Sequence, residues 1–454
     1  MKKSYQTLIS KILLLVLSLT IVLTVFASCG LFRNVADSKS ELENNINNSS
    51  EIGKYDYVTQ YLREWGLPLF NQTKFKYFED YFKQYFNLEG GLPNTYNHAK
   101  ETASLFVDKY YFSIDINDRT AVTDSLLECY VRAIGDPYSA YRPPVETQDY
   151  MTDMSGKFGG IGVMVEYNDL DKTIMVNTVY PDSPAEKAGI KTGDFIYAVN
   201  GKTVTELGYT NAVNYVRGEI GTNVELELIR DGEHITVTAT RAEVEELNVV
   251  YEVIEEENLG YVQIVAFKGN TFDQFKEAID SLEAAKVDGI IFDVRGNPGG
   301  YVDSVVAVIS YLIPDGKTIM SYQYKGRDKV VLVSDDDGSD HVVNLPFVVI
   351  CNEYTASAGE IFTAAIRDYR NEGMLDATIV GTTTYKKGIM QSSFYYPVDN
   401  STVTITVAYY NPPCGENYHG IGVAPDRVVE DESETIDLQL NAALEEMKKL
   451  LNAN

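Results

Sequence analysis

The chain has 454 residues, of which 44% are hydrophobic and 23% are charged, as in an ordinary soluble globular protein. This length allows two or three domains, each with its own hydrophobic core. The formal net charge of −28 disfavours nucleic acids and anionic lipid headgroups as ligands, because those ligands are themselves negatively charged.

The N-terminus has the pattern of a secretory signal, in which lysines precede an apolar run and small residues follow it. The run ILLLVLSLTIVLTVF is nearly long enough to span a membrane, so an uncleaved anchor is the alternative. The next residues, FASCG, resemble the bacterial lipoprotein signal, in which a cysteine after two small residues is lipidated. We therefore predict a signal peptide over residues 1–28 and a lipid on Cys29.

Two regions follow this signal along the chain. Residues 29–53 are polar and rich in Asn and Ser, which is typical of a flexible tether. Residues 54–157 carry aromatic and apolar side chains at helical spacing, as in HAKETASLFVDKYY and AVTDSLLECYVRAIG. They predict a helical N-terminal region that ends near GDPYSAYRPPVE, with the aromatic stripes in its core.

The rest of the chain changes from short strands to alternating strands and helices. Residues 158–243 contain alternating strands and glycine turns, interrupted by one helix in YTNAVNYVRG. Residues 244–430 alternate between strand and helix patterns, as in GYVQIVAF, FDQFKEAIDSLEAA and DGIIFDVRG, and residues 431–454 predict a C-terminal helix. The expected fold class is therefore a multidomain α/β protein.

The cysteines and histidines give no sign of a disulfide framework or a metal site. The cysteines after Cys29 are odd in number and widely spaced, and Cys351 ends an apolar run, where we expect a small core residue. The histidines are scattered, without the spacing of a zinc site. We expect neither a metal nor a cofactor.

One serine stands where a predicted strand meets a predicted helix, in LPFVVICNEYTASAGEIF. Taken alone, Ser357 at this position is typical of a helix N-cap, whose oxygen satisfies a free N–H group. A role as a nucleophile requires a base that removes the hydroxyl proton.

The chain lacks the sequence motifs of several known types of serine hydrolase. TASAG lacks the first glycine of the G-x-S-x-G elbow, and the S-x-x-K motif of penicillin-binding proteins is absent. No histidine has an obvious orienting acid nearby in sequence, and His419 of ENYHGIGVAPD is the candidate for a Ser-His alternative. A lysine in apolar surroundings is another possible base, because desolvation lowers its pKa from about 10.4 toward neutrality.

The candidate lysine lies in YKKGIMQ. Strand alternation would place Lys387 and Gln391 on the same face, where the amide accepts a hydrogen bond from the lysine and orients it. The alternative is a solvated lysine in a turn, which we expect of Lys386.

An acyl-transfer site also needs hydrogen-bond donors at the developing oxyanion. The segment DVRGNPGGYVDS follows a predicted buried strand, and its glycines allow backbone N–H groups to approach a substrate closely. The candidates are Gly299, Gly300 and the N–H group of Ala358. By itself, a Pro-Gly-Gly turn is only a loop signal.

Together these segments resemble one protease family over residues 103–429. The motifs GDPYSAY, FGGIGV, DSPAEKAGIKTGDFIYAVNG, DVRGNPGG, NEYTASAGEIF, KKGIMQ and GIGVAPD occur in the order found in the carboxyl-terminal processing, or tail-specific, serine proteases. This resemblance implies a protease core of the ClpP/crotonase-like type in residues 244–430. It also implies a Ser-Lys-Gln site, with Ser357 as nucleophile, Lys387 as general base and Gln391 as the residue that orients it.

The chain departs from the family pattern at a few positions. Gly359 stands where the family usually has a second serine, Gly296 where it has Asn, and Lys386 where it has Gly. The segment RDYRNEGMLDA is also a few residues longer than usual. No departure removes a catalytic group, but the double lysine leaves open which of the two is the base.

Residues 158–243 resemble a PDZ domain through GGIGV and GIKTGDFIYAVNG. The resemblance makes this glycine-rich segment the loop that binds a peptide carboxylate, because consecutive N–H groups form an anion nest and the next strand pairs with the peptide. The helix in YTNAVNYVRG would form the other wall of the groove. The predicted carboxylate-binding residues are Gly159, Gly160, Ile161 and Gly162.

These resemblances imply a serine endopeptidase that captures the C-terminal tails of protein substrates and cleaves them. It would be held on the extracytoplasmic face of the cell membrane by a lipid or an N-terminal anchor, with no nucleic-acid partner. Two alternatives remain at this point: a catalytically silent lipoprotein whose PDZ domain is a scaffold, and a Ser-His hydrolase that uses His419. The sequence does not define the oligomeric state.

Overall fold

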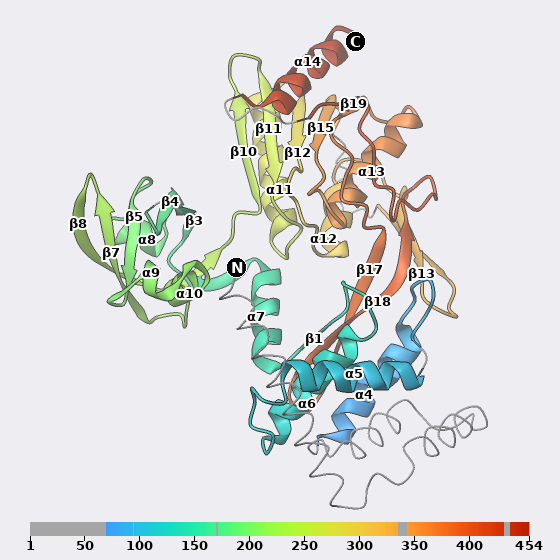
Figure 1. Cartoon of the computed structure of the whole chain (residues 1–454). Helices are drawn as coiled ribbons and strands as arrows, with labels where there is room; N and C mark the ends of the chain where they lie inside the picture. Colours follow the sequence, from blue (N-terminus) through green and yellow to red (C-terminus); the bar gives the residue numbers. More distant parts are fainter. Residues whose placement is uncertain (1–69, 94, 169–170, 335–342, 431–435, 454) are drawn as a thin grey trace, which may run out of the picture.

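The fold is described from a computed structural model, and Figure 1 shows its elements in chain order. The predicted signal peptide, the tether and Cys29 lie outside the residues that the structure describes. In the described part of the chain, no helix is both long and apolar enough to cross a membrane. The described residues are 70–93, 95–168, 171–334, 343–430 and 436–453.

Helices α4 to α6 form the blue and cyan body in Figure 1. Helix α4 begins after Asn71, whose side chain accepts a hydrogen bond from the N–H of Lys74. One face of α4 carries the fully buried Phe75, Phe78 and Phe82, at the spacing of an amphipathic helix. The helices are α4 (Gln72–Tyr85), α5 (Thr95–Lys109), α6 (Arg119–Arg132) and, further along, α7 (Pro144–Ser155).

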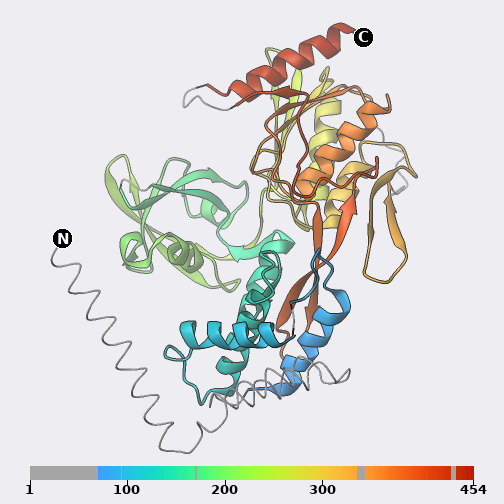
Figure 2. The ribbon, with the colours of Figure 1, turned by 45° about the vertical axis from the view of Figure 1, so that its right-hand side comes forward.

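This helical body shares its core with a strand from far along the chain. Strand β18 (Thr402–Asn411) pairs with β1 (Ala140–Arg142), and its apolar residues are buried against the phenylalanines of α4. The same strand pairs with β17 (Ile389–Tyr395) and with β13 (Thr318–Gln323), which pairs with β14 (Lys329–Val333). Figure 2 shows the β17–β18 hairpin running from the core to the N-terminal helices.

A buried lysine holds the tip of that hairpin. Lys74 Nζ lies 2.8 Å from Asp124 Oδ1 of α6 and 2.8 Å from Asp399 Oδ2, next to β18. The hydroxyl of Tyr141 also donates to Asp124 at 2.6 Å. The helices and the hairpin are therefore joined by ion pairs as well as by apolar packing.

The green body in Figure 1 is a small sheet with short helices. Its strands run in the order β3-β4-β5-β7-β8, with β6 beside β5, and β2 pairs separately with β9. The single predicted helix is present as α10, but α8 and α9 add two one-turn helices. The elements are β2 (Lys157–Gly160), β3 (Val163–Asn168), β4 (Thr173–Val179), α8 (Pro184–Lys187), β5 (Phe195–Val199), β6 (Lys202–Thr203), α9 (Val204–Leu207), α10 (Tyr209–Val216), β7 (Asn223–Arg230), β8 (Glu233–Thr240) and β9 (Ala242–Glu245).

The third body is an α/β core around a sheet with the strand order β10-β11-β12-β15-β16-β19. All pairs in this sheet are parallel except β10 with β11. The strands are β10 (Val249–Ile254), β11 (Leu259–Ile264), β12 (Ile290–Asp293), β15 (Phe347–Cys351), β16 (Ala377–Gly381) and β19 (Arg427–Val428), and the helices are α11 (Thr271–Ala285), α12 (Val302–Ser310), α13 (Ala358–Asn371) and α14 (Leu438–Ala453).

Alternate residues of the central strands face different helices. Phe292 and Val349 pack in the cluster that contains α11, α12 and α13, whereas Ile291 and Val348 pack against α14. Burial on both faces explains why β12 and β15 are continuous apolar runs in the sequence. The C-terminal helix predicted over residues 431–454 is present, but it begins only at Leu438.

The described cysteines Cys129, Cys351 and Cys414 are all free thiols. Cys351 is fully buried at the end of β15, as predicted for a small core residue.

Candidate active site

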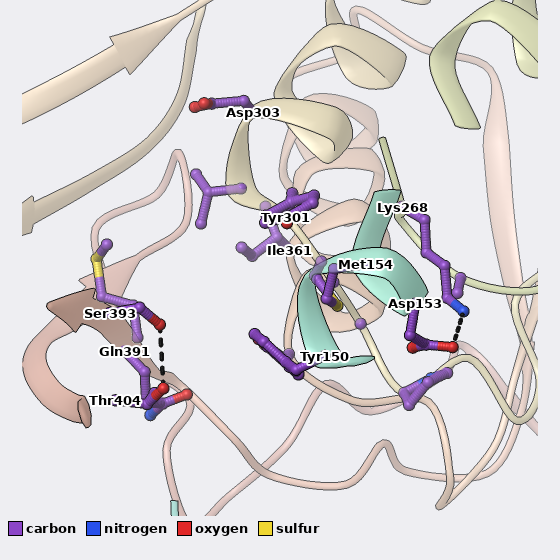
Figure 3. Close-up of a pocket in the computed structure, with 18 of the residues that line it drawn as sticks. Tyr150, Asp153, Met154, Lys268, Tyr301, Asp303, Ile361, Gln391, Ser393 and Thr404 are labelled. Atoms are coloured by element: carbon purple, nitrogen blue, oxygen red, sulfur yellow. Dashed lines mark hydrogen bonds and ion pairs between the residues drawn. The ribbon is translucent and has the colours of Figure 1, made fainter. Parts of the chain in front are cut away.

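A cavity of about 510 Å³ lies where the α/β core, the β17–β18 hairpin and α7 meet. Figure 3 shows Gln391 and Thr404 of the hairpin on one side of it, and Tyr150 and Met154 of α7 facing them. The structure brings all the predicted catalytic and oxyanion residues to this cavity: Ser357, Lys387, Gln391, Gly299, Gly300 and Ala358.

Ser357 has an unusual backbone conformation. It is the N-cap residue of α13, with φ 53° and ψ −113°, in the turn that follows the buried strand β15. A non-glycine residue rarely adopts such angles, and strained residues of this kind cluster at functional sites. Sharp strand-to-helix turns of this type expose the nucleophile of α/β-hydrolases. The missing first glycine of G-x-S-x-G therefore did not exclude this geometry.

Glu360 connects the backbones of the serine and lysine segments, a role that the sequence analysis missed. This fully buried carboxylate accepts the N–H group of Ser357 at 3.0 Å and that of Lys387 at 2.8 Å. It also accepts the Thr384 hydroxyl at 2.6 Å and the Lys386 N–H at 2.7 Å. An acidic residue three positions after a helix-capping serine is the sequence signal that would have revealed it.

The candidate oxyanion donors have different roles. The N–H group of Gly299 donates to Asn297 Oδ1 at 2.8 Å, so in this structure it is not free to bind an oxyanion. Among the described residues, the N–H groups of Gly300 and Ala358 have no hydrogen-bond acceptor. These two groups border the cavity beside Ser357 and are available to a ligand.

Gly299 has a steric role instead. Its φ is +100°, and an added Cβ would lie 2.7 Å from Ser357 Cβ and 2.9 Å from Ala358 N. Only a residue without a side chain fits between this loop and the serine turn.

Lys387 reaches the cavity from a loop rather than from a strand. Strand β17 begins at Ile389, and its pairing with β18 is irregular between Met390 and Gln391. The predicted strand alternation is therefore wrong, although both side chains border the same cavity. The neighbouring Lys386 is exposed, as expected of a solvated lysine.

The surroundings of Lys387 make it easier to deprotonate than an exposed lysine. Burial lowers the pKa of Lys387 below its usual 10.5, and the negative charges of Asp136 and Glu360 oppose this shift. Its ammonium lies 4.7 Å from the ring centroid of Tyr138. The Tyr410 hydroxyl lies 2.6 Å from the Lys387 carbonyl and 3.3 Å from that of Ser357, which connects the two segments again.

His419 is not among the described residues that border the cavity. Its Nδ1 lies 3.3 Å from the N–H of Gly388, and its ring packs edge-on against Tyr409. The geometry therefore gives no support to the Ser-His alternative.

A second cavity, of about 350 Å³, lies between β3 and α10. Gly160, Ile161 and Gly162 border it, whereas Gly159 is not among its described lining residues and its carbonyl accepts the N–H of Gly218 at 3.0 Å. The predicted helix wall is present as Tyr209, Val213 and Val216 of α10.

A positively charged residue, Arg217, borders this groove. The guanidinium of Arg217 borders the cavity and lies 4.3 Å from the ring centroid of Phe158, which also borders it. Glu246 and Leu247, from the segment that leads into the α/β core, complete the wall. A mostly apolar groove, with Arg217 and Glu246 at its wall and a glycine-rich loop, suits an extended peptide with a free carboxylate.

Two family models match parts of the chain. Residues 258–429 match the model of peptidase family S41, and residues 175–230 match that of a PDZ domain. The chain contains an S41 peptidase core and a PDZ domain. The S41 segment includes Ser357, Lys387 and Gln391.

Bacterial relatives also resemble the chain. It is 35% identical over 308 residues to the carboxy-terminal processing protease CtpA of Bacillus subtilis (strain 168), a match that covers 68% of this chain and 64% of that protein. It is 33% identical over 305 residues to a probable CtpA-like serine protease of Staphylococcus haemolyticus (strain JCSC1435), which covers 67% of this chain and 59% of the relative. The chain thus spans less than two thirds of either relative.

A solved structure supports the fold of the S41 core and PDZ domain. The crystal structure of a putative S41 protease from Bacteroides fragilis NCTC 9343 matches 82% of this chain and 96% of its own, with a TM-score of 0.53. The sequence identity is 17%, so this likeness shows the fold alone.

Proposed function

We propose that this protein is a serine endopeptidase that captures the C-terminal tails of protein substrates through its PDZ domain and cleaves them with a Ser-Lys-Gln site. The observation that carries the proposal is the strained turn that presents Ser357 to a cavity shared with the half-buried Lys387. The S41 family match and the name of the Bacillus subtilis relative support it.

Each residue has a step in the proposed reaction. Neutral Lys387 takes the proton of the Ser357 hydroxyl as the oxygen attacks the carbonyl carbon of the scissile peptide. The N–H groups of Gly300 and Ala358 stabilise the oxyanion of the tetrahedral intermediate. The protonated lysine then donates its proton to the departing amine, which leaves an acyl-enzyme. Lys387 next activates the water that hydrolyses this ester, and Gln391 holds the lysine in place.

Capture of a tail would occur at the second cavity. A peptide that lies beside β3 pairs with it as an added strand, and its terminal carboxylate meets the glycine-rich loop and Arg217. The apolar lining of the groove, including Ile161, Val213 and Val216, favours tails that end in apolar side chains.

The location of the protein is also part of the proposal. The signal pattern in residues 1–28 and the cysteine at position 29 support export and a lipid anchor on the extracytoplasmic face of the membrane. Partitioning of wild type and Cys29→Ala into detergent tests the anchor. Equal partitioning of both proteins would argue against lipidation.

The two adjacent lysines offer a matched test of catalysis. We expect Ser357→Ala and Lys387→Met to abolish cleavage of a peptide with an apolar C-terminus, whereas Lys386→Met retains it, because Lys386 is exposed. Retained tail binding by Ser357→Ala would show that its groove is intact. Equal turnover by Lys387→Met and wild type would refute the lysine base, and absence of cleavage by wild type would favour the silent scaffold.

A further inference from the structure

We propose that Asp136 acts through Thr406 to fix the orientation of the Gln391 amide, and that both are positioning residues for the base Lys387. This inference rests on the proposed function, since it assumes that Lys387 is the base and Gln391 orients it. Asp136 belongs to GDPYSAY, a motif of the N-terminal region for which the sequence suggested no chemical role.

Asp136 is a buried acceptor with several donors. Only 7% of the residue is exposed. Its Oδ2 accepts the hydroxyls of Ser139 at 2.6 Å and Thr406 at 2.7 Å, and its Oδ1 accepts the N–H of Tyr138 at 3.1 Å. Buried carboxylates with this many donors are held in one orientation.

The carboxylate determines the direction of the next hydrogen bond. An ionised carboxylate can only accept, so the single hydroxyl proton of Thr406 points to Asp136. The Thr406 oxygen is then left as an acceptor, and it lies 3.1 Å from Gln391 Nε2. The amide nitrogen of Gln391 must face Thr406, which leaves Oε1 as the atom that can accept a proton from the lysine.

The irregular pairing of β17 and β18 makes this chain possible. Met390 lies opposite Ala408, but Gln391 lies opposite Thr406, so Val407 is bulged out of the pairing. Without the bulge, Gln391 would lie opposite Val407, which has no polar side-chain atom. The N–H of Thr406 donates to Ser139 Oγ at 3.2 Å, which ties the bulged strand to the Asp136 loop.

Asp136 also acts on the lysine by charge. The charged and titratable groups that face Lys387 are Asp136 from the loop after α6, Glu360 from α13 and Tyr138, whose ring lies under the ammonium. The two carboxylates raise the pKa of Lys387 against the effect of burial. Removal of the charge on Asp136 therefore lowers this pKa further, whereas removal of the Thr406 hydroxyl changes no charge.

Two variants separate these effects. We expect Thr406→Val and Asp136→Asn to lower kcat about tenfold or more, the factor for one hydrogen bond to a charged group, with a smaller change in KM. In Asp136→Asn the acidic limb of the kcat/KM profile should also move to lower pH, because the lysine becomes neutral at lower pH. In Thr406→Val this limb should stay nearer to its wild-type position.

Thr402→Val is the matched control. Thr402 is a buried threonine of the same strand, and its hydroxyl lies 3.1 Å from that of Thr147 rather than near Gln391. We expect this variant to keep wild-type kcat, and thermal melts of all three variants report on folding. Thr406→Val decides the inference if Asp136→Asn does not fold.

The outcomes also distinguish this inference from the proposed function. If kcat in folded Thr406→Val equals that of Thr402→Val, the positioning role is wrong, whatever Lys387 does. If wild type shows no acidic limb and Lys387→Met retains turnover, the base itself is wrong and the inference fails with it. The proposed function is supported if wild type shows an acidic limb and Lys387→Met has no turnover. A loss of kcat in Thr406→Val then supports the positioning role as well.

Discussion

Substitution of Gly299 by alanine should lower kcat strongly, although Gly299 has no side chain that takes part in the reaction. The new Cβ would lie 2.7 Å from Ser357 Cβ and 2.9 Å from both Ala356 O and Ala358 N. Two carbon atoms in optimal contact are about 3.5–4.0 Å apart, so the serine turn or the glycine loop must move. The backbone φ of +100° adds strain that a glycine does not experience.

The expected loss of kcat in Gly299→Ala depends on how far the serine turn is displaced. A shift of Ala358 N–H away from the oxyanion should cost about 10²–10³ in kcat, as loss of one oxyanion donor does. The backbone strain should lower the free energy of unfolding by about 1–3 kcal/mol. Peptide cleavage and a thermal melt of the same preparation measure the two quantities.

Gly296→Ala is the control within the same loop. Gly296 also has a positive φ, of +69°, but an added Cβ there meets no atom within 4 Å. This variant should show a modest loss of stability and nearly wild-type kcat. Retention of full activity by Gly299→Ala, or equal loss in both variants, would refute the steric argument.

Three further outcomes are expected. The kcat/KM of wild type should rise with pH, with a midpoint below pH 10.5, because burial lowers the pKa of Lys387 and only the neutral amine accepts a proton. A flat pH profile would contradict this expectation. Lys74→Met should lower the free energy of unfolding by about 3 kcal/mol in chemical denaturation, since it leaves the carboxylates of Asp124 and Asp399 without their cation. Arg217→Ala should raise KM for a peptide with a free C-terminal carboxylate but not for its amidated form, and an equal rise for both would argue against carboxylate recognition by Arg217.

Local patterns predicted much of this protein, because several of its determinants are close in sequence. The buried strand before Ser357, the helix after it and the α10 wall of the PDZ groove all follow from periodicity and turn residues. The whole set of motifs, rather than any single one, indicated the S41 core and the PDZ domain that the comparisons show.

The errors arose where distant segments determine local geometry. The bulge opposite Gln391 belongs to the pairing with β18, so alternation within KKGIMQ did not reveal it. Glu360 accepts hydrogen bonds from Thr384 and Lys386, which lie more than twenty residues further along the chain. Such contacts depend on tertiary structure rather than on the local pattern.

Strand β18 contributes Val403 and Ile405 to the core of the N-terminal helices and Tyr410 to the core of the α/β body. This position has a consequence for the order of folding. Arg142 Nη1 donates to Thr404 Oγ1 across 262 residues, and Val403 and Ile405 complete the core under α4. A growing chain can pack Phe75 and Phe82 of α4 against Tyr130 of α6 early, but the face of this core that β18 covers stays open until β18 has been synthesised. Truncation before residue 402 should therefore leave that face open to a hydrophobic dye such as ANS. Because Lys387 and Gln391 are attached to the same hairpin, the nucleophile would meet its base only after nearly the entire chain has emerged.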